Sequence, residues 1–467
     1  MNEKRVFSLQ NFEQSQTAFE KRDQIPQLIQ YLSNYENDEI ALSECLEDLK
    51  LLSSMKPSPI DIFFLNGIEA VLTNFLETQT NECLLSDALC ILNNILMSTE
   101  EHTEKLVKAG ILKVLTELIS TIDDFELIEN VLLCLTNIVE DSNRYCAELV
   151  ENNFIKSILN FFSQEYPVNI IRCGTWLLLN ICKGASFLYH GPLLKSIIQI
   201  FNSLLQIDDD IIKKNSCKGI EALSIQKNAI SLFLSEQVIN NLLSLLINTE
   251  LIQYKQQIQI LDTILIIIGK CSANQLSQIL EFKLLQVLLQ ILEIKFTPLL
   301  YQKFIQIIFQ ISLRGEHFIG ELFNSDLLKL IIDIANSKIN YISNENFHLL
   351  IKMIRIWNTK AQYEHCIWIN TAIGIKLFAN FLQKKKHVNL EILFSTLTII
   401  NQIIQSKNGK LISLMENFRI FHLVKNYLQD KDEQIRLISH QILDTLQRTG
   451  NTSDIVEEIE LEEEEKI

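Results

Sequence analysis

Three asparagines recur at one position of an apolar helical pattern, and their side chains could bind a polypeptide backbone. Asn94, Asn137 and Asn180 each stand in a Leu-x-Asn-Ile phrase, and successive members lie 43 residues apart. A buried helix is apolar nearly all round, so an amide that recurs at one position indicates a specific role. Because an amide both donates and accepts hydrogen bonds, a row of amides can hold an extended peptide without reading its side chains.

Two further side chains suit a lysine-rich ligand. Trp176 precedes Asn180 by four residues, so both are expected on one face of a helix. An exposed indole can pack against a lysine stem and attract its ammonium group through a cation–π interaction. Asp141 follows Asn137 by four residues and could bind that ammonium group. The alternative for Trp176 is packing in the hydrophobic core.

The 43-residue period also predicts the elements that carry these residues. Gly67, Gly110 and Asn153 keep the same spacing ahead of apolar runs, and each tolerates the positive φ of a tight turn. Lys283 and Asp326 stand in similar settings, again 43 residues apart. This period lies in the range of armadillo and HEAT repeats, which contain two or three helices. One such repeat cannot bury its own apolar face, so neighbouring repeats are expected to stack.

Composition and helical patterning predict an all-α fold. The 467 residues include only 12 Gly and 6 Pro, which favours helices joined by short turns. We therefore predict a solenoid of about ten armadillo or HEAT repeats over residues 24–449. Early and late helices are expected from about Asp38 to Ser53 and from about Asp432 to Arg448. Residues 1–23 are expected to form a disordered polar segment, and residues 450–467 a disordered acidic tail that either aids solubility or binds a partner.

Charge and motif content narrow the class of function. The formal net charge of −16 favours a basic partner and disfavours nucleic acid or an anionic membrane surface. The apolar stretches fall short of the roughly 20 residues of a membrane span. Cysteines in apolar runs, such as Cys90, Cys134 and Cys182, are expected as small core residues rather than disulfides or metal ligands. Isolated histidines and the lack of a phosphate loop or nucleophile motif predict no enzyme, no cofactor and no metal.

The phrases, the period and the Trp176–Asn180 pair together resemble importin-α, the armadillo adaptor family that carries basic nuclear-localisation peptides. The resemblance covers about residues 24–449 and implies a right-handed armadillo-repeat solenoid of about ten three-helix repeats. In that family each peptide-binding repeat carries a Trp and, four residues on, an Asn, with acidic residues nearby. The resemblance implies a peptide-binding site made of Asn94, Asn137, Trp176, Asn180, Asp141 and Thr103.

Other positions depart from the family pattern. Cys90 and Leu133 stand at the first two tryptophan positions, and Lys218 stands at the fourth, where it would repel a basic cargo. In the second half, Gln306 and Gln310 occupy the Trp and Asn positions of a later repeat, so the family's second peptide site is expected to be lost. Two tryptophans have no assigned register: Trp357 and Trp368.

The resemblance implies an adaptor that binds basic nuclear-localisation peptides in a concave groove for import into the nucleus, and so a protein of the cytoplasm and nucleus. It also implies importin-β and an export receptor as partners, although residues 1–23 are shorter and less basic than the family's importin-β-binding segment. The alternative is an armadillo scaffold that binds a protein partner outside nuclear transport. A negative field near Asp141 would favour the adaptor, and Lys218 favours the scaffold.

Overall fold

The structure is a computed structural model in which all described secondary structure is helical. It describes residues 22–34, 38–184, 191–226, 228–247, 254–338, 342–360, 372–383 and 390–448. The polar segment expected before residue 22 and the acidic tail expected after residue 449 lie outside the described residues, as does Trp368.

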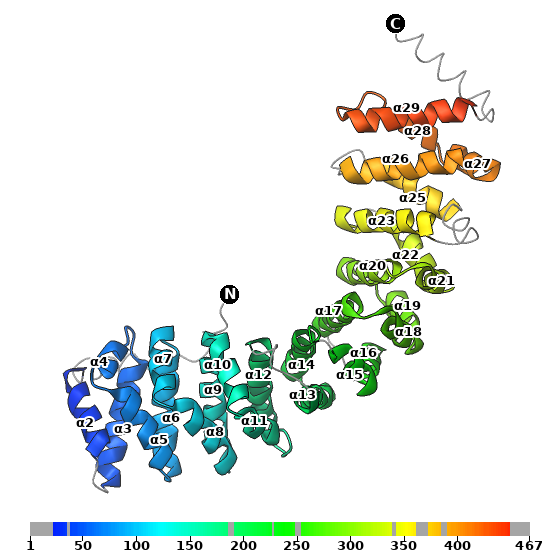
Figure 1. The fold of residues 1–467 in the computed structure, drawn as a ribbon. Helices are drawn as coiled ribbons and strands as arrows, with labels where there is room; N and C mark the ends of the chain where they lie inside the picture. The colour runs from blue at the N-terminus through cyan, green and yellow to red at the C-terminus, as the bar shows by residue number, and fades with distance from the viewer. Residues whose placement is uncertain are drawn as a thin grey trace. The chain divides into compact units, whose positions relative to one another are not determined.

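The chain forms two compact units. The first unit is Met1–Glu236 and the second is Gln237–Ile467. In each unit the repeat consists of a short first helix, a second helix and a long third helix, and the helices of successive repeats stack side by side (Figure 1).

In the first unit the third helices form one continuous row. They are α3 (Glu39–Ser54), α6 (Glu82–Leu96), α9 (Phe125–Asp141), α12 (Val168–Gly184) and α14 (Asp210–Leu223), each packed on the next. The second helices are α2 (Ile25–Asn34), which follows a 3-10 turn η1 (Arg22–Gln24), then α5 (Ile68–Thr78), α8 (Ile111–Thr121), α11 (Ile155–Phe161) and α13 (Gly191–Leu204). The first helices are α4 (Ile60–Leu65), α7 (Glu100–Lys108), α10 (Asn143–Glu151) and α15 (Ala229–Ser235).

The second unit repeats this arrangement. Its third helices are α17 (Tyr254–Lys270), α20 (Pro298–Ser312), α23 (Asn344–Lys360), α26 (Leu390–Gln405) and α29 (Glu433–Arg448), again packed in order. Its second helices are α16 (Val238–Ile247), α19 (Leu284–Ile294), α22 (Asp326–Ser337), α25 (Ala372–Gln383) and α28 (Ile420–Lys425). Its described first helices are α18 (Ala273–Glu281), α21 (Glu316–Phe323) and α27 (Gly409–Asn417). The described third helices of the two units together match the predicted number of repeats, and α3 and α29 begin within one residue of the predicted helices.

The core explains why the Leu-x-Asn-Ile phrase recurs. Leu92, Leu135 and Leu178 are fully enclosed between neighbouring third helices, and the isoleucine that ends each phrase is fully enclosed as well. The asparagine between them is partly exposed in all three repeats. The apolar positions of the phrase therefore form the stack, and the asparagine is carried at its edge.

The turns ahead of the second helices confirm the positive φ expected at the turn residues of the 43-residue period. Gly67, Gly110 and Asn153 adopt φ values of 75°, 97° and 59°. Lys283 also takes a positive φ, at 64°, immediately before α19. Asp326 also stands ahead of an apolar run, as the period predicts, but its turn differs: Asp326 is the first residue of α22 and follows the extended residue Ser325.

Two further turns of this kind were not predicted. Gln237 and Arg419 have φ values of 61° and 55° immediately before α16 and α28. Neither residue type favours the left-handed region, so the sequence carries no local signal for these turns. The tertiary stack imposes the conformation there.

Candidate functional site

The structure places the three predicted asparagines on consecutive third helices of the first unit. Asn94 lies on α6, Asn137 on α9 and Asn180 on α12, and all three are partly exposed. These helices pack on one another in that order. The exposed side of the third helices α3, α6, α9, α12 and α14 is called the third-helix face below.

Each asparagine also links its repeat to the repeat before it. The amide nitrogens Nδ2 donate as follows: Asn94 to Ser53 Oγ at 2.9 Å, Asn137 to Asn93 Oδ1 at 3.3 Å, and Asn180 to Glu140 Oε1 at 3.0 Å. An amide has two N–H donors and an acceptor oxygen, so one bond orients the group without using its full capacity. The asparagines are therefore held in fixed orientations on the third-helix face.

Asn93 is a member of this row that the sequence interpretation missed. Its Oδ1 accepts from Asn137, and its Nδ2 lies 3.5 Å from the backbone oxygen of Asn130 on α9. It therefore connects α6 to α9 through two hydrogen bonds. The signal was present in the first phrase, where two asparagines stand next to each other.

Asp141 and Thr103 form a pair, but only Asp141 reaches the surface. Asp141 ends α9 and is partly exposed, whereas the side chain of Thr103 on α7 is fully buried. Thr103 Oγ1 donates to Asp141 Oδ2 at 2.6 Å. The threonine therefore orients the carboxylate and cannot itself contact a peptide on the surface.

The column of tryptophan positions lies on the third-helix face as the family register implies. Cys90, Leu133, Trp176 and Lys218 are all partly exposed, on α6, α9, α12 and α14. Trp176 is thus not enclosed in the core, and it shares a face of α12 with Asn180. The prediction that Cys90 is a core residue is wrong, because Cys90 is partly exposed, whereas Cys134 and Cys182 are fully buried as predicted.

The second unit uses tryptophan differently. Trp357 on α23 is fully enclosed, its Nε1 donates to Ser312 Oγ at 2.9 Å, and its ring meets Phe323 edge-on with the centroids 5.4 Å apart. It is a core residue. Gln306 and Gln310 are partly exposed on α20, where the register places the Trp and Asn positions.

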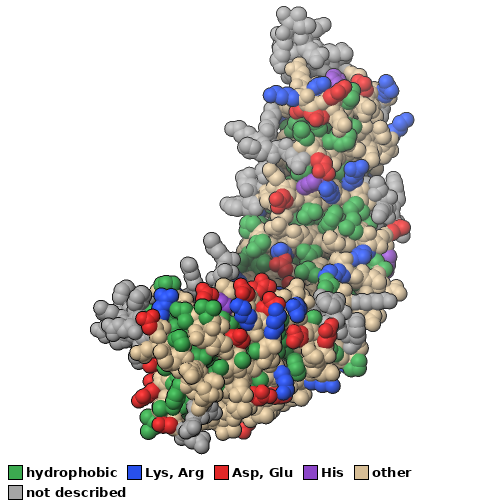
Figure 2. Space-filling model, turned by 60° about the vertical axis from the view of Figure 1, so that its left-hand side comes forward, with side chains coloured by type: hydrophobic (Ala, Val, Ile, Leu, Met, Phe, Trp, Pro, Cys, Tyr) green, Lys and Arg blue, Asp and Glu red, His purple; other side chains and the backbone are tan. Residues whose placement is uncertain are grey.

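Acidic residues are concentrated in the part of the first unit that carries Asn94 and Asn137. Residues 39–141 contain 19 Asp and Glu but only 5 Lys and Arg. Residues 237–448 contain 16 Asp and Glu and 22 Lys and Arg. Figure 2 shows acidic side chains gathered beside basic ones on the visible face of the first unit. The field around the first three repeats is therefore negative and attracts cations.

A serine, a histidine and an aspartate meet near the start of α7. His102 Nδ1 lies 2.9 Å from Ser98 Oγ, and His102 Nε2 lies 3.1 Å from Asp61 Oδ1. The imidazole is 7% exposed and stacks on Phe64 with the centroids 4.4 Å apart. Ser98 Oγ also hydrogen-bonds to the backbone oxygen of Ile95. The cluster joins α7 to α4.

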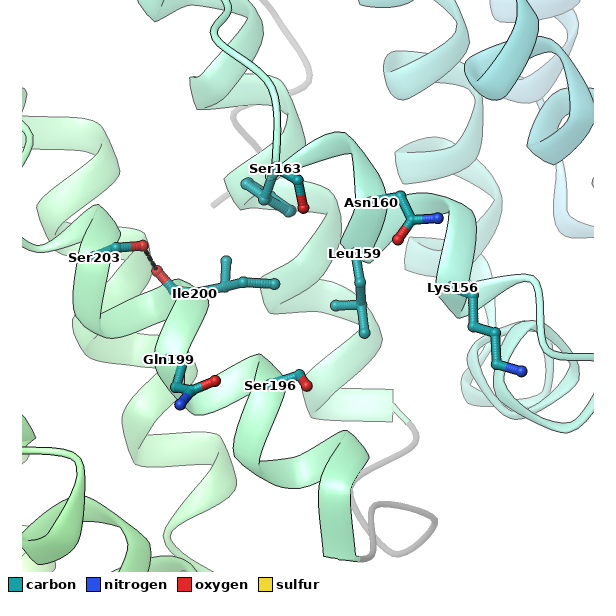
Figure 3. Close-up of a pocket in the computed structure, with 9 residues that line it drawn as sticks. Lys156, Leu159, Asn160, Ser163, Ser196, Gln199, Ile200 and Ser203 are labelled. Atoms are coloured by element: carbon teal, nitrogen blue, oxygen red, sulfur yellow. Dashed lines mark hydrogen bonds between the residues drawn. The ribbon is translucent and has the colours of Figure 1, made fainter.

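A cavity of about 440 Å³ lies on the second helices of the first unit. Its lining comes from α11 and α13 and consists mainly of neutral polar and aliphatic side chains, among them Asn160, Ser196 and Gln199 (Figure 3). It contains none of the predicted site residues. Among the described residues no three His, Cys, Asp or Glu side chains are placed to hold a metal ion.

Among the described helices, one bent pair has the length and composition of a membrane span. In the described part of the chain no single helix is long and apolar enough to cross a bilayer. Only α15 and α16 reach that length and composition when taken together, and a bend separates them.

Known structures share this stack of helices. An engineered protein solved as a structural genomics target superposes with a TM-score of 0.66 over 91% of this chain and 98% of its own, at 16% sequence identity. The fold is an armadillo-like helical solenoid. A designed armadillo repeat protein in complex with the peptide (KR)4 matches 52% of this chain and 99% of its own, with 18% identity and a TM-score of 0.46. Searches of protein-family models and of curated proteins find no match.

Proposed function

We propose that the first unit binds an extended, basic segment of a partner protein along the third-helix face. The observation that carries this proposal is a coincidence of two features. Three oriented asparagines lie on consecutive third helices, and two of them lie within residues 39–141, where acidic side chains far outnumber basic ones. Amides suit the peptide backbone, and the negative field suits Lys and Arg side chains.

Each residue has a distinct part in this proposal. Asn94, Asn137 and Asn180 hydrogen-bond the backbone of the bound segment. Asp141, oriented by Thr103, binds a ligand ammonium group. Trp176 provides an apolar wall for the stem of a second basic side chain.

The proposed site has fewer aromatic walls than the importin-α pattern. Cys90 and Leu133 replace two tryptophans at partly exposed positions. A cation–π contact contributes about 0.5–2 kcal/mol, so the loss of two such contacts lowers affinity for any basic peptide. The proposed ligand is therefore held mainly by its backbone and by charge.

Within this proposal the protein acts as an importin-α-like adaptor for nuclear import and is present in cytoplasm and nucleus. Recovery of importin-β or an export receptor with the purified chain supports this cellular role. Recovery of neither, with basic-peptide binding intact, replaces it by a role outside nuclear transport. The proposal includes no catalytic step.

A scaffold outside nuclear transport is the second candidate, and one observation favours it. All three asparagines already donate to a neighbouring third helix, which is a structural role in the stack. A scaffold would use these bonds for stability and would bind its partner by other residues. The two candidates therefore predict different results with a lysine-rich peptide: the first predicts that it binds along the third-helix face, and the second predicts that it does not.

Fluorescence anisotropy with a labelled lysine-rich peptide tests the proposal. We expect the double variant Asn137→Ala with Trp176→Ala to weaken binding by at least about tenfold, since it removes a backbone contact and a cation–π contact. The matched control is Gln306→Ala with Gln310→Ala on α20, which should leave the affinity unchanged. Equal affinity of the first double variant and the wild type would rule out this site.

A further inference from the structure

Two lysines stand where the row of asparagines ends. Lys183 is exposed on α12, three residues after Asn180 and seven after Trp176, so all three share one face of the helix. Lys218 is partly exposed on α14, which packs directly against α12. A lysine at the fourth tryptophan position is thus part of a pair rather than an isolated substitution.

The two ammonium groups act on each other. Partial burial lowers the pKa of Lys183, and the neighbouring Lys218 lowers it further, while Glu140 and Glu221 act in the opposite direction. Among the ion pairs of the described residues, none includes Lys183 or Lys218.

A nearby cation on the same helix as Lys183 has an ion-pair partner among the described residues, unlike the two lysines. The guanidinium group of Arg172, also on α12, is already paired with Asp209, to which its Nε donates at 2.9 Å. Lys183 and Lys218, in contrast, have no such ion pair in the part of the chain that the structure describes, so their positive charge would stabilise an anion bound next to them.

The charge of the chain changes at this point along the stack. Residues 142–236 contain 9 Lys and Arg and 8 Asp and Glu, in contrast to the strongly acidic residues 39–141. A ligand that follows the third-helix face from α6 to α14 thus passes from a strongly acidic part of the chain to a part of nearly balanced charge that carries Lys183 and Lys218. A uniformly basic ligand fits only the first part.

We propose that Lys183 and Lys218 bind an acidic group on the same partner segment that places its basic residues over α6 and α9. This inference rests on the proposed function and defines the partner's chemistry: a basic stretch followed, in one chain direction, by a carboxylate or a phosphate. Trp176 and Asn180 then lie between the two charge subsites. A phosphorylated serine or threonine and a glutamate share the required chemistry.

The geometry of stacked helices sets the spacing. Packed helices lie about 8–10 Å apart, and an extended residue spans about 3.3–3.6 Å, so each repeat accommodates about two to three residues. The acidic group is therefore expected about three to five residues from the lysine bound at Asp141. The structure does not distinguish the two chain directions, so both are tested.

Anisotropy measurements on the whole chain test this with labelled peptides of equal length. One peptide carries a lysine-rich stretch and alanines, and the others replace one alanine by glutamate or phosphoserine, four residues before or after that stretch. We expect one of the two orders to bind at least about fivefold more tightly than the alanine peptide, with phosphoserine above glutamate because of its larger charge. Lack of any gain in both orders overturns the inference.

A double variant, Lys183→Gln with Lys218→Gln, localises the effect. It should abolish the gain from the acidic group and leave binding of the alanine peptide unchanged or slightly tighter, while the control Lys113→Gln on α8 preserves the gain. A gain that persists in the double variant places the anion elsewhere and overturns the inference. Binding of the alanine peptide reports on the proposed function separately, so its failure with every peptide overturns both proposals.

Discussion

The two units build the same stack of third helices and differ in the side chains along its exposed edge. In the first unit a tryptophan on α12 is partly exposed beside an asparagine, whereas in the second unit a tryptophan on α23 is enclosed and hydrogen-bonded to Ser312. Asparagines and an excess of acidic residues mark the first unit. Glutamines on α20 mark the second unit, and its residues 237–448 contain 22 Lys and Arg but only 16 Asp and Glu.

This difference separates what makes the fold from what makes a site. Leucines and isoleucines at a fixed period bury the faces between repeats in both units, and they specify no ligand. Ligand preference depends on the few polar and aromatic side chains at the exposed positions and on the charge around them. A basic ligand is therefore expected to prefer the first unit.

The largest expected contrast is between Trp357→Ala and Trp176→Ala. Removal of the enclosed ring of Trp357 should cost about 3–5 kcal/mol of unfolding free energy, because it leaves a cavity and removes the hydrogen bond from the indole to Ser312. Removal of the partly exposed Trp176 should cost about 1 kcal/mol or less and should weaken peptide binding instead. Urea denaturation followed by circular dichroism measures both. Similar losses for the two variants would mean that both tryptophans are core residues.

Much of the fold could be predicted because apolar periodicity directly encodes stacked helices. The period located the left-handed turns at Gly67, Gly110 and Asn153, where the residue types themselves favour positive φ. It failed at Gln237 and Arg419, because there the packing of neighbouring helices imposes the turn on residues that do not favour it. Residue type is a reliable guide only where local and tertiary preferences agree.

The candidate site was predictable in position but not in detail. The spacing correctly placed Asn94, Asn137 and Asn180 at exposed edges of third helices. It could not show that Thr103 is buried beneath Asp141, because burial depends on a contact between α7 and α9. The bonds between the asparagines and neighbouring repeats likewise depend on side-chain rotamers that only the packed structure fixes.

Two helical glycines give an intermediate contrast between the units. A Cβ on Gly219 of α14 would lie 2.3 Å from the ring of Phe201, whereas a Cβ on Gly269 of α17 meets nothing within 4 Å. Gly219→Ala should therefore destabilise the protein by about 1–3 kcal/mol. Gly269→Ala should stabilise it by about 0.5–1 kcal/mol, because alanine loses less backbone entropy in a helix. Thermal unfolding of both variants tests this, and destabilisation by Gly269→Ala would contradict the open environment at that position.

Ion pairs between third helices provide a smaller, pH-dependent contrast. The Arg172 guanidinium lowers the pKa of the Asp209 carboxyl, with help from the backbone N–H groups of Ile212 and Ile211. A lowered pKa stabilises the fold above the unfolded value of about 3.9, and this stability is lost as the pH falls through the folded-state pKa. Asp209→Asn should cost about 1–2 kcal/mol at pH 7, and the difference from the wild type should shrink below about pH 4.

The matched control for that substitution lies in the second unit. Asp262 pairs with Lys303 between α17 and α20, and its side chain is 33% exposed, compared with 7% for Asp209. Asp262→Asn should cost about 0–1 kcal/mol, because solvent screens the more exposed carboxylate. A pH series of urea midpoints compares the two variants. If the loss of unfolding free energy in Asp209→Asn stays constant down to pH 3, the carboxylate charge of Asp209 is not what stabilises the wild type.

Photo-crosslinking tests the central claim most directly. A lysine-rich peptide carrying a photoreactive phenylalanine derivative is bound to the whole chain and irradiated, and the attachment sites are mapped by mass spectrometry. We predict that the sites cluster on α6, α9 and α12, and that added salt suppresses them because it screens the negative field of residues 39–141. Crosslinks confined to the second unit, or spread equally over both units, would contradict the assignment of the peptide site to the first unit.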